Sequence, residues 1–280
     1  MSIAPMHPGR GRELVCARKL MTRFLIAAAW AGIALAEPVS VRHPEGALHG
    51  FLALKALDGE TLADGDLIQF TRGDQVTSRS TFHFRDGSLQ DETVVFSQKG
   101  QFRLVSDHLV QTGPRFPHPS DLSIDVAARR VIVRYRDDHG KDQVVDESMD
   151  LPADLANGLM LTLVRNLEAD SAATVSMIAA APKPRLIQLT MRKEGEDTVS
   201  VGGSPRKSTR LVVKIEIGGV AGLVAPLVGK KPPDTRVWLL GGDVPAFLKS
   251  EGPLYFGGPV WRVEPTVPSW PQTAAANPAR

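Results

Sequence analysis

Hydrophobic and polar residues alternate along most of the chain, from about residue 48 to about residue 264, in short runs separated by turn residues. RLVVKIEIGG, LIQLTMRK and VIVRY are typical, because every second residue in each run is apolar. Successive side chains of a strand point to opposite faces, so each run predicts a strand with one face on a core and the other toward water. Glycine-containing turns separate the runs at 72–74, 86–87, 99–100, 138–140 and 194–196. Roughly a dozen such strands predict a mainly β fold, either an antiparallel β-barrel or a two-lobed β-sandwich.

One segment departs from the two-residue period. Between Leu151 and Leu167, apolar residues recur at spacings of three and four, and Pro152 suits a first helical turn. This pattern predicts one internal helix, about 152–167, that packs on the sheet or plugs one end of a barrel. The helix separates two β-rich lobes, about 40–150 and 172–264, within a single domain that begins at residue 37.

The first 36 residues have the composition of a secretory signal peptide. Basic residues precede an apolar run that ends in Ala34-Leu35-Ala36, which predicts cleavage near Ala36 and a periplasmic or secreted protein. The run has roughly a dozen residues, whereas a membrane-spanning helix needs about 20, so we expect no stable membrane anchor. Met21 opens a more compact leader than Met1, and both starts stay open.

Removal of the leader changes the charge of the remaining chain. The whole sequence has 33 basic and 31 acidic residues, but the leader holds five of the basic ones and only one acidic one, Glu13. The mature part is therefore slightly acidic, which gives no electrostatic reason to expect nucleic acid or an anionic membrane as a partner. Cys16 also lies in the leader, so the mature chain has no disulfide and no cysteine-ligated metal, and no sequence motif indicates a cofactor.

The stretch FHFRDGSL predicts a β-hairpin. A two-residue turn at Asp86-Gly87 would pair His83 with Gln90. The register expected for the next hairpin would then pair Gln90 with His108. The three polar side chains would form one row across three strands, on one face of the sheet.

The same face is predicted to be polar at one end and apolar at the other. Glu92 would lie in the row beside the histidines, and Phe96 would lie opposite Phe102 at the apolar end. The predicted ligand-binding residues are therefore His83, Gln90, Glu92, His108, Phe96 and Phe102. Two strand spacings place the histidines about 10 Å apart, too far to share one metal ion but suitable to bracket a ligand. If this end of the sheet is open to water, the same residues are ordinary surface.

Four further segments allow a functional and a structural interpretation. The proline-rich loop 113–121, which contains Phe116 and His118, could cover a barrel mouth or simply connect two strands. The apolar segment 218–234 could be a lid, a partner surface or a cap on the core. The basic turn 202–210 could bind an anion or be solvated. The tail 265–280 lacks alternation and is expected to be disordered.

Several segments together resemble the pattern of an uncharacterised bacterial exported-protein family. They are FHFRDGSLQDETVVFSQKGQFRLVSDH, GPRFPHPSD, LPADLANG, GGVAGLVAPLVGKKPPD and GGPVWR. The strand-rich halves are also similar, by architecture alone, to lipocalin-like β-barrels of the periplasm. The resemblance implies a barrel-like fold and no particular activity.

These observations predict an exported, non-enzymatic envelope protein that binds an apolar or amphipathic small ligand, such as a lipid, inside a β-barrel. A scaffold or protein-interaction module of the envelope is the first alternative. A hydrolase that uses His83, His108 or His118 is the second, although the sequence has no GxSxG, HExxH or dinucleotide-binding motif.

Overall fold

The computed structural model describes residues 38–137, 139–168, 170–180, 183–216 and 232–268. The predicted signal peptide, most of the apolar segment 218–234 and the tail from residue 269 lie outside these ranges. Within them, no helix is long and apolar enough to cross a membrane.

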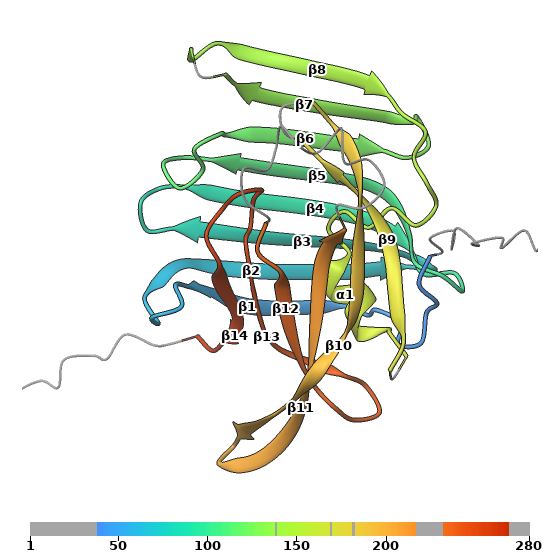
Figure 1. The fold of residues 1–280 in the computed structure, drawn as a ribbon, viewed down its shortest axis with the longest axis vertical. Coiled ribbons are helices and arrows are strands. Elements are labelled where there is room, and N and C mark those ends of the chain that lie inside the picture. Colours follow the sequence, from blue (N-terminus) through green and yellow to red (C-terminus); the bar gives the residue numbers. More distant parts are fainter. Residues whose placement is uncertain (1–37, 138, 169, 181–182, 217–231, 269–280) are drawn as a thin grey trace, which may run out of the picture. The chain divides into compact units, whose positions relative to one another are not determined.

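In the described part of the chain, fourteen antiparallel strands form one sheet (Figure 1), which confirms the mainly β prediction. The strand order is β8-β7-β6-β5-β4-β3-β2-β1-β14-β13-β12-β11-β10-β9. The elements are β1 Leu48–Lys55, β2 Thr61–Arg72, β3 Gln75–Phe84, β4 Leu89–Ser97, β5 Arg103–Thr112, β6 Ser120–Asp125, β7 Arg130–Arg136, β8 Asp142–Ser148, α1 Met160–Arg165, β9 Ala172–Ala179, β10 Arg185–Val201, β11 Ser204–Glu216, β12 Thr235–Leu240, β13 Ala246–Gly252 and β14 Trp261–Thr266.

The sheet consists of two runs of neighbouring strands joined at the chain's first and last strands. Strands β1 to β8 follow one another in order, strands β9 to β14 do the same, and β1 pairs with β14. Figure 1 shows the second run crossing over the first, with α1 beside it. The segment that contains α1 links the two runs.

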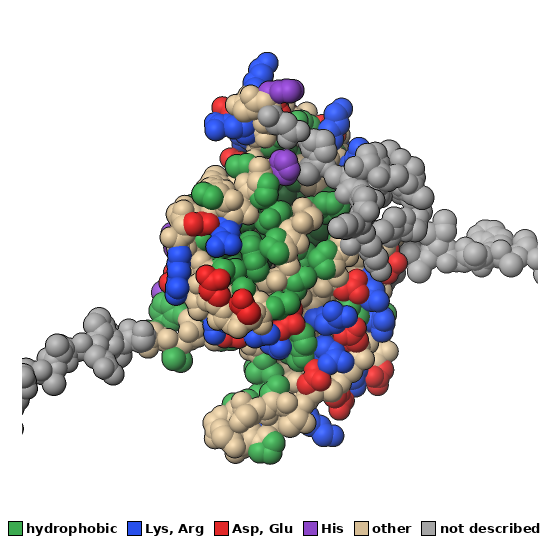
Figure 2. All heavy atoms as spheres, turned by 60° about the vertical axis from the view of Figure 1, so that its left-hand side comes forward, with side chains coloured by type: hydrophobic (Ala, Val, Ile, Leu, Met, Phe, Trp, Pro, Cys, Tyr) green, Lys and Arg blue, Asp and Glu red, His purple; other side chains and the backbone are tan. Residues whose placement is uncertain are grey.

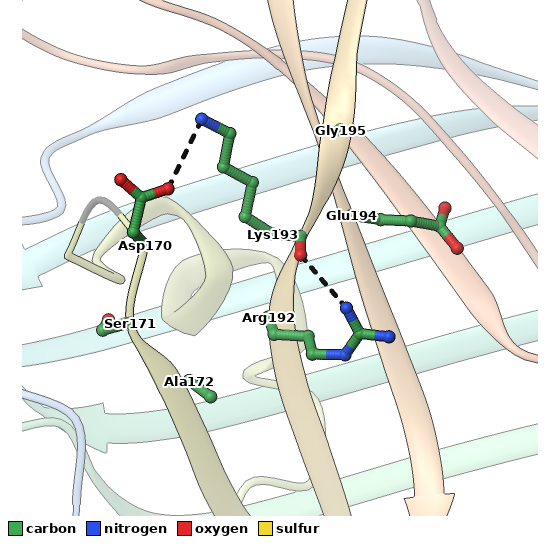
Figure 3. A pocket seen from close by; sticks show the side chains of 7 residues that line it. All are labelled: Asp170, Ser171, Ala172, Arg192, Lys193, Glu194 and Gly195. Carbon is green, nitrogen blue, oxygen red and sulfur yellow. Dashed lines mark hydrogen bonds and ion pairs between the residues drawn. The ribbon is translucent and has the colours of Figure 1, made fainter.

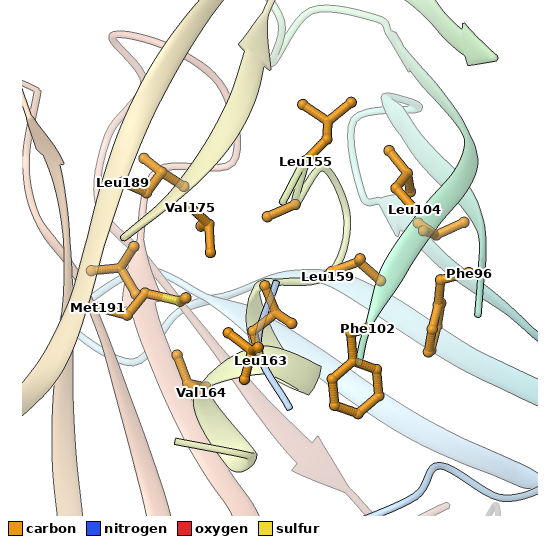
Figure 4. Close-up of a cluster of buried hydrophobic side chains, with 14 of the residues drawn as sticks. Phe96, Phe102, Leu104, Leu155, Leu159, Leu163, Val164, Val175, Leu189 and Met191 are labelled. Carbon is orange, nitrogen blue, oxygen red and sulfur yellow. The ribbon is translucent and has the colours of Figure 1, made fainter. Parts of the chain in front are cut away.

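The main core lies between the two runs of strands. Its residues are the inward side chains of alternating strands, among them Phe96, Leu189 and Met191, which are almost inaccessible to water. Figure 4 shows Leu159 and Leu163 lying between strands β4–β5 on one side and β9–β10 on the other. The helical segment therefore fills the space between the sheets with its own side chains.

A smaller aromatic cluster lies apart from the main core. Phe84 contacts Phe116 and Trp261, with ring centroids 5.5 and 5.7 Å apart, and Tyr255 contacts Phe116 at 5.6 Å. Phe116 is 2% exposed. The loop 113–121 thus anchors its aromatic side chain in this cluster, whereas His118 is exposed.

The helix is shorter than the prediction of 152–167, because residues before Met160 form only isolated turns and bond to β9. Asn157 donates from Nδ2 to the carbonyl of Ile178 (3.1 Å) and accepts its N–H (2.8 Å). Asp154 accepts the hydroxyl of Ser176 at 2.9 Å. Local side-chain bonds of this kind compete with helix formation, and here they hold the chain in a strand-like bridge.

Two other sequence predictions are wrong at strand ends. Residues 194–196 are not a turn, because β10 continues through them with a bulge between Lys193 and Gly195. A Cβ on Gly195 would lie 3.0 Å from the guanidinium of Arg210, which crosses the strand there. The predicted disordered tail begins too early, since Pro265 and the next residue belong to β14 and pair with β1.

A buried ion pair attaches the helix to the start of the described chain. Arg165 donates from Nη1 to both carboxylate oxygens of Glu45, at 3.0 and 3.1 Å. Gln69 of β2 donates to the same carboxylate at 3.2 Å. Glu45 is 8% exposed, so its charge is compensated where water does not reach it.

Gly158 provides a test of how tightly the segment before α1 packs on the sheet. Its φ is +66°, and a Cβ there would lie 2.1 Å from Cγ2 of Val94, whereas Gly100 has a φ of +74° and nothing within 4 Å. We expect Gly100→Ala to cost about 1 kcal/mol for its backbone conformation alone. Gly158→Ala should cost about 1–3 kcal/mol more because of overpacking. Urea unfolding of both variants measures this difference, and equal losses would contradict the packing described here.

Candidate functional site

The β3–β4 hairpin differs by one residue from its predicted register. The N–H of Phe84 donates to the carbonyl of Ser88 (2.9 Å), so three residues form the turn and Gly87 takes a positive φ of 84°. Asp86 Oδ1 accepts the N–H of Ser88 at 3.0 Å, which stabilises the three-residue loop. His83 therefore pairs with Leu89 rather than with Gln90.

The β4–β5 hairpin also departs from its prediction, because the N-terminal segment takes part in it. Phe102 N–H donates to the carbonyl of Val39 (2.9 Å), and Ser40 pairs with Gln101. These bonds draw Phe102 out of the hairpin ladder, so Phe96 lies opposite Leu104. The predicted pairing of the two phenylalanines is wrong, although both side chains are buried in the main core.

A β-bulge in β5 then changes which side chains face inward. Val95 pairs with Ser106 and Phe96 with Leu104, so Val105 has no partner on β4. One extra residue reverses the facing of everything that follows it in the strand. Asp107 consequently faces inward and is buried, and its neighbour His108 is exposed.

The predicted row of His83, Gln90 and His108 does not form. Both histidines lie on the outer, exposed face of the sheet, where His108 Nε2 lies 3.1 Å from Asp121 Oδ1. Gln90 lies on the inner face, opposite Phe82 and Gln111. The three-residue turn shifts the register of His83 by one residue, and the bulge in β5 shifts that of His108 by one residue.

The inner face of β4 and β5 carries its own polar side chains. Gln111 donates from Nε2 to Oε1 of Gln90 (2.8 Å) and to the carbonyl of Leu254 (2.9 Å), so these buried amides have partners. Glu92 and Asp107 lie farther along the same face. Glu92 pairs with Leu109 and Asp107 with Val94, which places the two carboxyl groups on diagonal positions of neighbouring strands.

We call Glu92 and Asp107 the carboxyl pair. Asp107 is 2% exposed, and neither of its carboxylate oxygens has a hydrogen-bond partner among the described residues. Burial raises the pKa of Glu92 to about 7. Burial also raises the pKa of Asp107 well above its ordinary range, and the neighbouring Glu92 carboxylate adds to the rise, while the backbone N–H of His108 acts weakly in the opposite direction. Both carboxyl groups therefore keep their protons to a higher pH than ordinary carboxyl groups do.

The sequence contained a signal for the inward position of Asp107. Leu104 and Leu109 are an odd number of residues apart, yet both pack in or against the main core. Strict alternation would put one of them on the outer face, so the segment between them must contain an irregularity. No comparable signal distinguishes the three-residue turn at Gly87 from a two-residue one.

The outer face opposite the carboxyl pair has its charges matched. Arg79 forms an ion pair with Asp91, and this hydrogen bond lowers the pKa of Asp91. Arg134 lies 3.6 Å from Asp121, which also contacts His108. Within the described residues, no group of three or more potential ligands could hold a metal ion. This face is a conventional charged surface.

An open pocket of about 350 Å³ lies beside the bulge of β10 (Figure 3). Lys193 projects over it and pairs with Asp170 at 3.6 Å and Glu196 at 3.0 Å. Glu194 points to the other side of the strand, toward Arg236. Lys193 and Glu194 are thus already paired, and Arg192 donates to the carbonyl of Lys193, so the pocket is a weaker candidate site than the carboxyl pair.

No protein-family model and no curated protein matches the chain. A solved β-barrel-like protein of the domain of unknown function DUF1849, from Brucella abortus, is similar over 79% of this chain and 98% of its own, at 10% identity and a TM-score of 0.42. A likeness this distant carries no argument about the fold, ligand or activity of this chain.

The raised pKa of Glu92 predicts an unusual dependence of stability on pH. Between its ordinary value of 4.5 and about 7, the folded protein holds more protons than the unfolded chain, so stability falls as pH rises. From about pH 5 to about pH 8 the wild type should lose at most about 3 kcal/mol more than Glu92→Gln. Urea unfolding at the two pH values measures this loss.

Asp91→Asn is the matched control for this measurement. Asp91 precedes Glu92 but faces outward, and its lowered pKa places its titration below the tested range. Its variant should therefore follow the pH dependence of the wild type. A Glu92→Gln variant that also follows the wild type would show that Glu92 is not perturbed.

Proposed function

We propose that the protein is an exported envelope protein that binds a small amphipathic molecule at the inner face of its sheet, without catalysing a reaction. The observation that carries the proposal is the unpartnered, buried Asp107 beside Glu92, at the point where the inner face changes from polar to apolar. Burying a carboxyl group without a partner is costly, and such groups are concentrated at functional sites.

The apolar side of the proposed site is a row of inward residues that begins beside Glu92. Cross-strand pairing from β5 to β8 aligns its members, which are Leu109, Leu122, Val133 and Val145. The two end members, Leu109 and Val145, are only partly buried and pack against the main core, as does Tyr135. We call these three partly buried residues, Leu109, Tyr135 and Val145, the apolar strip.

The strip differs from the apolar residues that the sequence suggested for a ligand. Phe96 and Phe102 are enclosed in the main core, where Leu159 and Leu163 occupy the space around them. Figure 2 shows a face of the molecule on which hydrophobic side chains gather at the centre, with acidic and basic side chains around them. Partly exposed apolar surface of this kind is common where ligands bind.

Export is supported by the sequence of the first 36 residues, with its basic start, short apolar run and small-residue end. A hydrolase is less well supported than binding. His108 contacts Asp121 on the exposed face, but among the described residues no hydroxyl bonds to its ring. Thr93 and Ser123 pair with His108 on neighbouring strands, but neither hydroxyl is hydrogen-bonded to the ring, as an activated nucleophile would be.

The apolar strip predicts binding of a fluorescent apolar probe, N-phenyl-1-naphthylamine. We expect the purified mature protein to enhance its fluorescence in a saturable manner. Leu109→Asn should weaken the affinity about 10-fold, because it places an amide where the apolar part of the ligand lies. Val144→Asn is the control, since Val144 is 63% exposed on β8 and lies outside the strip.

Unfolding transitions of both variants establish that they are folded. Saturable binding that Leu109→Asn weakens and Val144→Asn leaves unchanged would support the proposed function. Absence of saturable binding by the wild type, or an equal loss in both variants, would contradict it.

A further inference from the structure

We propose that the molecule bound at the inner face carries a cationic nitrogen head group, an ammonium or amidinium, that binds between Glu92 and Asp107 while its apolar part lies on the apolar strip. This inference rests on the proposed function and adds the class of ligand to it. It follows from three features of the carboxyl pair: its lack of a cation, the neutrality of its surroundings and its place at the end of an apolar row.

The carboxyl pair is unlike the other buried acidic residues of the described chain. Glu45 is also buried, but it accepts two hydrogen bonds from Arg165. Asp154 accepts the hydroxyl of Ser176. Asp107 alone among these buried acids has both oxygens unpartnered, and the charge nearest to it is the like charge of Glu92. An incoming cation would supply the missing partner.

The elements packed against the pair contribute no charge of their own. On β3 the cross-strand neighbours are Ser78 and Ser80, and on β6 the residue opposite Asp107 is Ile124. Above the pair lies Gly158, where a Cβ would be 3.3 Å from Oε1 of Glu92. The nearby segment has one carboxyl, that of Asp154, which already bonds to Ser176 on β9. A cationic head group would therefore meet only the two carboxyl groups.

An organic cation suits this site better than a metal ion. Calcium takes six to eight oxygen ligands, and magnesium requires a near-octahedral set, whereas the described residues offer only two carboxyl groups here. An ammonium or amidinium brings its own N–H donors and needs only acceptors, which the pair provides. The apolar row that begins at Leu109, opposite Glu92, gives the remainder of such a molecule a surface on which to lie.

Binding of the cation must be coupled to release of a proton. Burial favours the protonated form of both carboxyl groups, and a cation bound between them displaces the proton. The proton passes to solvent, and both carboxyl groups are then charged beside the positive head group. The affinity for a cationic ligand should therefore increase with pH, while the affinity for a neutral one should not.

The experiment uses three probes with the same ten-carbon chain: decylammonium, decanol and decanoate. Each displaces N-phenyl-1-naphthylamine from the mature protein, and displacement is measured at several values between about pH 5 and about pH 8. At the upper pH, decylammonium should bind at least about 10-fold more tightly than the other two. This preference should decrease toward the lower pH, where protons compete for the pair.

Variants of the pair identify the residues responsible. Glu92→Gln and Asp107→Asn should each remove the preference for decylammonium while decanol binding persists. Asp91→Asn removes a carboxylate from the same strand but from the outer face, and it should keep the preference. If Asp107→Asn does not fold, Glu92→Gln alone decides the outcome, because Glu92 is only partly buried.

The outcomes separate the two proposals. Equal binding of decanol and decylammonium would overturn the cationic head group and leave the proposed function intact. A preference that survives in Glu92→Gln would also overturn it. Loss of decylammonium binding on addition of calcium, without any effect on decanol, would assign the pair to a metal ion and contradict an organic cation. If none of the probes displaces the fluorophore because it never binds, the proposed function itself fails.

Discussion

The pairing of the first strand with the last is the constraint on which the rest of the structure depends. Five residue pairs between Phe51–Lys55 and Arg262–Thr266 join two runs of strands into one sheet. Because the joined runs cross over each other, their inner faces share one core with the segment around α1. The same pairing brings the β13–β14 connection against β5, where the carbonyl of Leu254 accepts a hydrogen bond from Gln111.

The inner face of this sheet has an apolar part, which packs into the core, and a polar part, which carries the carboxyl pair. Its apolar part is filled by Leu159, Leu163 and their neighbours, so most of the interior is closed by the protein itself. The carboxyl pair has no comparable role in packing, since a buried acid beside a second, partly buried acid destabilises a fold when no cation is present. Retaining such a pair is easier to explain by a ligand that compensates it than by any contribution to stability.

The sequence predicted the parts of the fold that local patterns determine. Alternation identified the strands, and residues such as Leu189, Met191 and Val213 are buried as expected. The helix was overestimated, because Asp154 and Asn157 bond to β9 rather than within the segment. A tertiary contact of this kind leaves no trace in local periodicity.

The candidate site was predicted only in part. The face of the sheet to which a side chain points depends on the strand register, and one residue more or less in a turn or bulge changes that register. Gln90 and Glu92 were correctly placed on the inner face, but His83 and His108 were not. One error came from a three-residue turn and the other from the bulge at Val105.

The most direct test of the account is an NMR titration of the Glu92 and Asp107 carboxyl carbons. We expect a midpoint of about 7 for Glu92 and a midpoint well above the ordinary range for Asp107. If both groups titrated near the ordinary values of about 4, the carboxyl pair would be exposed to water and the account would be wrong.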